Sequence, residues 1–114
     1  MISICNMCDK HTDEVIKMMR DFYASPAVST DGSEEIFQCD IENCINDCPY
    51  LEGYVFTDND ILMGYAMVAK SFSTEFGKPC IWIEDIYLKP EHCGKGVGSR
   101  FLLFIEQKYP NAIL

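Results

Sequence analysis

A glycine-rich stretch, Gly94-Lys-Gly-Val-Gly-Ser99, lies between a long apolar segment and an amphipathic one. The apolar segment, residues 80–88, is typical of a strand, whereas the apolar residues after Gly98 recur at helical spacing. A helix N-terminus has backbone N–H groups without partners and a partial positive charge, and glycines let a phosphate come close to the backbone. The pattern therefore predicts a cradle for a pyrophosphate group, to which Lys95 adds a positive charge.

The stretch matches neither of two common phosphate-binding motifs. It lacks the Gly-Lys-Ser/Thr ending of a P-loop. It is also not the GxGxxG turn of a dinucleotide-binding fold, which belongs to a first βα unit. On its own, the stretch is equally compatible with a glycine-rich helix start that binds nothing.

Two adjacent carboxylates, Glu84 and Asp85, stand in the middle of the expected strand at 80–88. Successive side chains of a strand point to opposite faces. We therefore expect Glu84 to share a face with Trp82 and Ile86, and Asp85 to make structural bonds on the other face. The alternative for Glu84 is a buried carboxylate bonded to the backbone or to a neighbouring base.

The elements that position these residues follow from apolar spacing and turn residues. We expect the order β-α-α-β-β-β-α-(β). Strands are expected at 2–8, 53–57, 61–70, 80–88 and 112–114. Helices are expected at 11–24 and 34–47, and a third helix is expected to begin at the glycines of 94–98 and to end at 109–111. Asp9 is the expected cap of the first helix, and Ser25-Pro26 is expected to end it. A hairpin turn is expected at 58–60 and a polar loop at 71–79.

The composition limits the class of protein. The chain has 114 residues, 48 % apolar and 12 % aromatic, which predicts one globular domain. Its formal net charge of −9 argues against sequence-independent binding to nucleic acid or to an anionic membrane, because both need basic patches. No apolar run approaches the roughly 20 residues that span a bilayer, and the first 13 residues lack the features of a signal peptide. We therefore expect a soluble, cytoplasmic protein.

The charge is unevenly distributed along the chain. Residues 1–60 carry 13 acidic and three basic residues, whereas residues 61–114 carry five acidic and six basic residues. One interpretation is a solvated surface on two acidic helices. The other is that the first half faces a cationic ligand and the second half an anionic one.

The chain has seven cysteines, an odd number, and no export signal, which argues against a disulfide framework. They are Cys5, Cys8, Cys39, Cys44, Cys48, Cys80 and Cys93. Cys5 and Cys8 have CxxC spacing, so a zinc site is one interpretation. The interpretation we favour is packing in the core, because free cysteine behaves as a small hydrophobic residue. We therefore expect no metal.

Residues 90–103, Pro-Glu-His-Cys-Gly-Lys-Gly-Val-Gly-Ser-Arg-Phe-Leu-Leu, resemble the acetyl-CoA-binding motif of the GNAT superfamily of N-acetyltransferases. That motif reads Arg/Gln-x-x-Gly-x-Gly/Ala, and here Cys93, Gly96 and Gly98 stand at its first, fourth and sixth positions. The order of the expected elements is similar to GNAT as well. Residues 81–88, Ile-Trp-Ile-Glu-Asp-Ile-Tyr-Leu, and 64–67, Gly-Tyr-Ala-Met, look most like the spermidine/spermine and thialysine acetyltransferases of this family.

The resemblance implies roles for particular residues. The pyrophosphate of the cosubstrate acetyl-CoA is expected on backbone N–H groups of Gly94, Lys95, Gly96, Val97, Gly98 and Ser99. The strand edge of Ile86, Tyr87 and Leu88 would pair with the pantetheine arm, and the N–H of Ile86 would stabilise the oxyanion. Glu84 would take the proton of the acceptor amine. Cys93 replaces the Arg or Gln of the motif, which weakens the expected binding of CoA.

The resemblance also implies a fold and a function. The fold is α/β, with a mixed, largely antiparallel sheet and helices on both faces. The function is transfer of an acetyl group to a primary amine of a polyamine or lysine-like molecule. The protein is expected to form a homodimer. Residues 1–114 are expected to form one domain that lacks its C-terminal helix and strands. The alternatives are an inactive acyl-CoA-binding module and a fragment completed by another chain. Tyr54, Tyr65 and Trp82 are expected in the core, or else along an acceptor tunnel.

Overall fold

The computed structural model describes residues 2–24 and 33–114. Four antiparallel strands form one sheet in the order β1-β2-β3-β4. They are β1 (Ile2–Asn6), β2 (Leu51–Asp58), β3 (Ile61–Ser73) and β4 (Lys78–Leu88). The helix end that the sequence predicts at Ser25-Pro26 lies outside the described residues.

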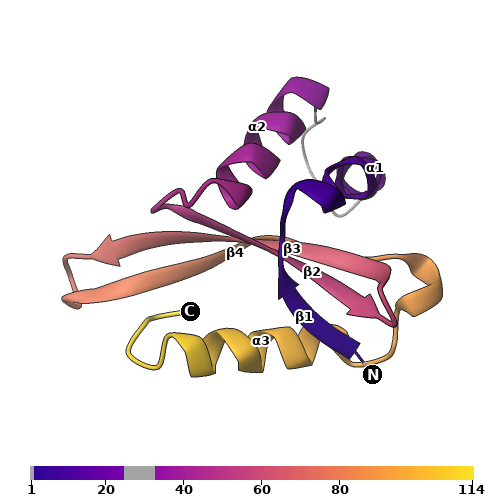
Figure 1. The fold of residues 1–114 in the computed structure, drawn as a ribbon. Coiled ribbons are helices and arrows are strands. Elements are labelled where there is room, and N and C mark those ends of the chain that lie inside the picture. The colour runs from indigo at the N-terminus through magenta and orange to yellow at the C-terminus, as the bar shows by residue number, and fades with distance from the viewer. Residues whose placement is uncertain (1, 25–32) are drawn as a thin grey trace.

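Helices cover both faces of the sheet (Figure 1). α1 (Thr12–Tyr23) and α2 (Glu34–Ile45) lie on one face, and α3 (Val97–Lys108) lies on the other. A separate cluster of buried apolar side chains fills the space on each side of the sheet. The predicted fold class, an α/β arrangement with a largely antiparallel sheet and helices on both faces, is confirmed.

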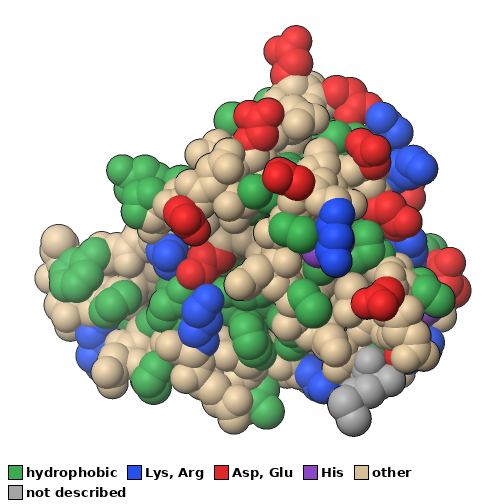
Figure 2. All heavy atoms as spheres, in the orientation of Figure 1, with side chains coloured by type: hydrophobic (Ala, Val, Ile, Leu, Met, Phe, Trp, Pro, Cys, Tyr) green, Lys and Arg blue, Asp and Glu red, His purple; other side chains and the backbone are tan. Residues whose placement is uncertain are grey.

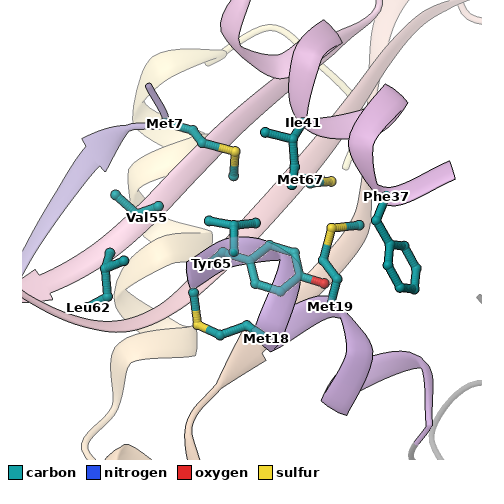
Figure 3. Close-up of a cluster of buried hydrophobic side chains, with 10 residues drawn as sticks. Met7, Met18, Met19, Phe37, Ile41, Val55, Leu62, Tyr65 and Met67 are labelled. Atoms are coloured by element: carbon teal, nitrogen blue, oxygen red, sulfur yellow. The ribbon is translucent and has the colours of Figure 1, made fainter. Parts of the chain in front are cut away.

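The core under α1 and α2 is rich in methionine. Met7, Met18, Met19 and Met67 point into the space around the ring of Tyr65 (Figure 3). Unbranched thioether side chains fill irregular gaps, such as those between a twisted sheet and two helices. This packing holds the C-terminal end of α1 over the middle of the sheet.

The core under α3 is aromatic. The ring of Phe101 packs on Tyr54 and Phe56 of β2, with centroid distances of 5.5 and 5.4 Å in edge-to-face geometry. Val97, the first residue of α3, is only 1 % exposed. The helix is therefore anchored from its first turn, and the glycine-rich turn before it is held at the end of β4.

The start of α1 differs from the sequence prediction. A short 3-10 helix, η1 (Asp9–His11), precedes α1, and Cys8 takes its N-terminal cap position. The backbone N–H of Cys8 donates to Nδ1 of His11 at 3.1 Å. The prediction that Asp9 caps the helix is therefore wrong, because Asp9 already lies inside the first turn.

The polar segment at 71–79 is not the loop that the sequence predicts. β3 continues to Ser73 and β4 begins at Lys78, so the two strands form a long hairpin whose tip extends beyond the helices (Figure 1). Its turn contains Gly77 at φ +64°, a left-handed conformation that glycine adopts without strain. Backbone pairing, to which polar residues contribute as well as apolar ones, explains the extension.

The hairpin turn predicted at 58–60 is confirmed, whereas the strand predicted at 112–114 is met only by a single bridge. The turn after β2 has Asn59 and Asp60 at φ 51° and 65°, as in a tight hairpin. Near Leu114, Ile113 forms a parallel bridge with Cys80: the Ile81 N–H donates to the Ile113 carbonyl at 2.8 Å. A single bridge, and not a strand, therefore lies within the segment 112–114 where the sequence predicts a strand.

Several side chains are more exposed than the sequence predicts. Trp82, expected in the core, is 62 % exposed, whereas Tyr54 and Tyr65 are buried as expected. Core packing, predicted for the cysteines, holds for Cys44, which packs against the core under α1 and α2, and is wrong for Cys5, Cys39 and Cys93, which are exposed. Within the described ranges, no group of three His, Cys, Asp or Glu side chains is arranged so that it could hold a metal ion. No helix in these ranges is long and apolar enough to cross a membrane.

Candidate active site

A β-bulge in β4 lies at the predicted catalytic residue. Ile83 pairs with Val68 and Asp85 pairs with Met67, so Glu84 is an extra residue without a partner on β3. An extra residue interrupts the alternation of side chains along a strand. Glu84 and Asp85 consequently line the same pocket on the face of α1 and α2. The prediction that they point to opposite faces, with Glu84 on the face of Ile86, is therefore wrong.

This pocket, which we call the acidic pocket, has a volume of about 440 Å³. Its lining residues come from α1, α2, the segment before β2, and the three strands beneath: Tyr23, Asp40, Asn43, Cys48, Tyr50, Leu51, Met67, Ala69, Glu84 and Asp85. Three of them are carboxylates, and none of these described lining residues is basic. Figure 2 shows the wider distribution, with acidic side chains gathered over α1 and α2.

Asp85 is the buried member of the three carboxylates. It accepts hydrogen bonds from the hydroxyl of Tyr23 at 3.0 Å and from that of Tyr65 at 2.8 Å. Burial raises the pKa of Asp85, the two tyrosine hydrogen bonds oppose this rise, and the charge of Glu84 adds to it. Asp85 thus ties α1 to β3 and β4, which is the structural role that the sequence suggested.

Asp40 is a pocket residue that sequence reasoning missed. It projects from α2 and is half-buried, and burial together with the charges of Asp85 and Glu84 raises its pKa. Only its place in the acidic first half of the chain pointed to it. Glu84 itself is exposed, so its carboxylate is accessible to a ligand.

The glycine-rich turn has the backbone geometry of an anion cradle. Gly94 and Gly96 have φ of 82° and 73°, which strain any residue with a Cβ. Gly96 is the N-cap of α3 and offers no side-chain cap. The N–H groups of Val97, Gly98 and Ser99, in the first turn of the helix, therefore have no acceptor within it.

The polar side chains around this turn differ from the GNAT motif at Cys93. The thiol of Cys93 donates to the carbonyls of Leu88 and Lys89, at 3.8 and 3.7 Å, so it ties the turn back to the end of β4. Lys95 Nζ lies 3.2 Å from Nδ1 of His92, a residue of the short helix η2 (Pro90–His92). Lys95 and His92 thus place a basic group beside the cradle.

The outer edge of β4 presents backbone groups near the carboxylates. The N–H of Ile81 points away from β3, toward Ile113. Side-chain face and N–H direction alternate together along a strand, and the side chains of Ile81 and Ile86 both lie on the α3 face. Across the bulge, the N–H of Ile86 therefore also points away from β3.

The cradle and this edge adjoin one another. A Cβ built on Gly98 would lie 3.9 Å from Cδ1 of Ile86. Ile86 follows Glu84 and Asp85 on the same strand. β4 thus contacts the first turn of α3 through Ile86 and lines the acidic pocket, on the other face of the sheet, through Glu84 and Asp85.

Comparison with known proteins identifies the class. Residues 13–112 match the sequence profile of the Acetyltransferase (GNAT) family, which covers most of the chain. The chain belongs to this family. The predicted family is therefore confirmed, whereas the resemblance to polyamine and thialysine acetyltransferases stays a prediction.

One curated relative and several solved structures are similar to the chain. The thialysine N-ε-acetyltransferase of Bos taurus is 44 % identical over 41 residues, which are 36 % of this chain and 24 % of that protein. The chain thus matches about a quarter of the length of this relative.

Two solved structures of low sequence identity share the fold. A possible acetyltransferase from Clostridium difficile 630 has a TM-score of 0.79 at 16 % identity, over 93 % of this chain and 69 % of that one. A predicted acetyltransferase from Clostridium acetobutylicum, crystallised with acetyl-CoA, has a TM-score of 0.72 at 13 % identity, over 95 % and 71 %.

Proposed function

We propose that this chain transfers the acetyl group of acetyl-CoA to a primary amine of a small molecule with at least two positive charges. The observation that carries the proposal is the acidic pocket, whose Glu84 and Asp85 directly precede Ile86, the residue that Gly98 of the glycine-rich turn approaches. The amine would attack directly while both substrates are bound. Membership of the GNAT family supports the reaction class.

The residues of the turn fit the pyrophosphate of acetyl-CoA. A Cβ built on Gly94 or Gly96 would meet nothing within 4 Å, so the space before the helix is open to a ligand. The first-turn N–H groups and the charge of Lys95 favour an anion there. Backbone groups would supply most of this cradle, so Cys93 at the first position of the motif is compatible with binding.

Tyr87 and Leu88 continue the edge of β4 from Ile86 toward the turn. An extended pantetheine arm would pair with this edge as an added strand does. Acetyl-CoA supplies an activated thioester carbonyl. The outward N–H of Ile86 would donate to the oxygen of that carbonyl as negative charge develops on it.

Glu84 is the proposed proton acceptor. An alkyl amine has a pKa of about 10.4, so only about one molecule in a thousand is nucleophilic at neutral pH. A carboxylate holds the ammonium and takes its proton, directly or through water. The nitrogen of the neutral amine then forms a bond to the acetyl carbon and loses a second proton. The C–S bond breaks, and coenzyme A leaves with the electron pair as a thiolate, which takes up this second proton.

The charges of the pocket favour a diamine or polyamine as the acceptor. Asp40, Glu84 and Asp85 attract ammonium groups, and the described lining residues include no base to pair with a carboxylate. A lysine-like acceptor brings its own carboxylate into this field. It remains the second candidate because the curated relative is a thialysine acetyltransferase.

The proposal is tested by measuring acetylated amine after incubation with acetyl-CoA and a diamine, a monoamine or lysine. Chromatographic detection of the product is needed, because the seven cysteines of the chain would react with a thiol reagent. We expect turnover to be highest with the diamine. Glu84→Gln should lower kcat/KM by roughly 10²- to 10⁴-fold.

The matched control is Glu106→Gln, which removes an exposed carboxylate from α3 on the other face of the sheet. Its kcat/KM should equal that of the wild type. Binding of acetyl-CoA without turnover of any amine would instead favour the inactive acyl-CoA-binding module. A homodimer, also implied by the resemblance, is tested by sedimentation of the same samples.

A further inference from the structure

A row of three cross-strand neighbours runs through the floor of the acidic pocket. Leu51 of β2 pairs with Ala69 of β3, and Ala69 pairs with Trp82 of β4. Directly paired residues of antiparallel strands place their side chains on the same face. Leu51 and Ala69 line the acidic pocket, so the side chain of Trp82 lies on the pocket side of the sheet, next to Ala69.

Two large aromatic side chains beside this pocket are exposed. Trp82 is 62 % exposed, and Tyr50, which lines the pocket beside Leu51, is 70 % exposed. The backbone of Tyr50 is fixed, because its carbonyl accepts the N–H of Lys70 at 2.8 Å. An exposed tryptophan or tyrosine side chain offers the face of its ring to a cation that approaches the pocket.

We propose that Trp82 and Tyr50 form an aromatic rim that binds the second ammonium group of the acceptor. This inference rests on the proposed function and assigns the two aromatic residues to substrate specificity. The face of an aromatic ring attracts a cation. Three carboxylates line the pocket, and the two aromatic residues lie at its margin. One ammonium group of a diamine would therefore contact carboxylates, and the other would contact aromatic rings.

The spacing along β4 sets the size of the acceptor. Trp82 precedes Glu84 by two residues, which span about 7 Å of a strand. An amine that reacts near Glu84 would place a second nitrogen at Trp82 if three or four methylene groups separate the two. A monoamine of the same length would reach the rim with an uncharged end.

Trp82 is the single tryptophan of the chain, so its fluorescence reports directly on the rim. The experiment titrates the protein with 1,3-diaminopropane, 1,4-diaminobutane or butylamine, in the presence and absence of acetyl-CoA. We expect a saturable change in emission with both diamines. Butylamine should need a concentration about 2- to 5-fold higher, which is the value of one exposed cation–π contact. Equal concentrations for diamine and monoamine would overturn the proposal.

Variants separate the rim from the reaction. Trp82→Ala should reduce the preference for 1,4-diaminobutane over butylamine, as a ratio of kcat/KM, about 2- to 5-fold, and Trp82→Phe should restore part of it. The matched control is Phe72→Ala, an equally exposed aromatic residue of the same hairpin. Phe72 pairs with Pro79, two residues along from the pair of Lys70 and Ile81, which faces α3. Side chains two residues apart on a strand share a face, so Phe72 lies on the α3 face, away from the pocket. Phe72→Ala should leave the preference unchanged.

Failure of the rim and failure of the proposed function give different results. Turnover of diamines with an unchanged preference in Trp82→Ala would overturn the rim and leave the function standing. A saturable, diamine-selective change of Trp82 emission without turnover would support the rim and contradict the function. No binding and no turnover with any of the amines would overturn both.

Discussion

Glu84 and Asp85 are consecutive residues of one strand, yet both line the same pocket. The bulge opposite Met67 and Val68 removes the alternation that would separate them. Asp85 then turns inward to two tyrosine hydroxyls, and Glu84 stays accessible. Two adjacent carboxylates therefore have different tasks, one in the fold and one in the proposed chemistry.

This difference predicts opposite results for two alanine variants. Asp85→Ala leaves the hydroxyls of Tyr23 and Tyr65 without their acceptor, which should lower the free energy of unfolding by about 2–3 kcal/mol. Glu84→Ala removes an exposed side chain and should change it by less than about 0.5 kcal/mol. Urea denaturation followed by circular dichroism measures both. Equal loss in the two variants would contradict the assignment.

Glu52 predicts how stability depends on pH. It accepts hydrogen bonds from Tyr54 at 2.7 Å and Tyr109 at 2.6 Å, and it pairs with Lys70 and Lys108, each at 3.3 Å. Burial alone would raise its pKa, but these hydrogen bonds and the nearby positive charge outweigh burial and lower the pKa to about 2. Because the folded pKa lies below that of the unfolded chain, Glu52 stabilises the fold above the unfolded value. This stabilisation is lost as the pH falls from about 4.3 through 2.

The test compares wild type with Glu52→Gln from pH 7 to pH 2. At pH 7 the variant should be less stable by about 1–2 kcal/mol, and the difference should shrink as the pH falls through this window. Comparison at each pH cancels the contributions of Asp40 and Asp85, whose raised pKa values act in the opposite direction. A difference that is constant with pH would show that Glu52 acts by packing alone.

Thiol reactivity tests the position of the cradle without any enzymatic assay. Cys39 and Cys93 are exposed, so both should react readily with iodoacetamide. Burial, followed by the charges of Asp40 and Asp85, raises the pKa of Cys44 to about 12, so Cys44 should react slowly.

Acetyl-CoA should slow the alkylation of Cys93, which precedes the glycine turn. Cys39 lies on α2, on the other side of the sheet, and serves as the internal control. Peptide mass spectrometry resolves the two sites in one sample. Equal protection of both cysteines, or of neither, would argue against binding of acetyl-CoA at this turn.

The sequence predicted the parts of the molecule that depend on local pattern. The strand, glycine turn and helix at 80–108 could be predicted because apolar spacing and glycines mark them. The family assignment rested on the same residues. The bulge at Glu84 was not predictable in this way, because it is a property of the pairing between β3 and β4. Its consequence, the shared pocket of Glu84 and Asp85, was missed for the same reason.

Residues that are defined by tertiary neighbours were also missed. Asp40 joins the acidic pocket only because α2 packs above the sheet. Trp82 was expected in the core from its residue type, but its side chain is largely exposed. Composition shows how much apolar surface a chain has to bury, and not which apolar residue stays outside.

The central claim, that the turn before α3 holds acetyl-CoA, is tested most directly by calorimetric titration of acetyl-CoA into wild type, Gly96→Glu and Gly77→Glu. Both glycines have left-handed φ, 73° and 64°, and open space around a Cβ, so the two variants carry the same strain and the same added charge. Only Gly96 lies in the cradle. We predict saturable binding by wild type and Gly77→Glu, and at least a roughly tenfold loss of affinity in Gly96→Glu, because the new carboxylate competes for the helix N-terminus. Equal affinities of the two folded variants, or no binding by the folded wild-type chain, would contradict the claim.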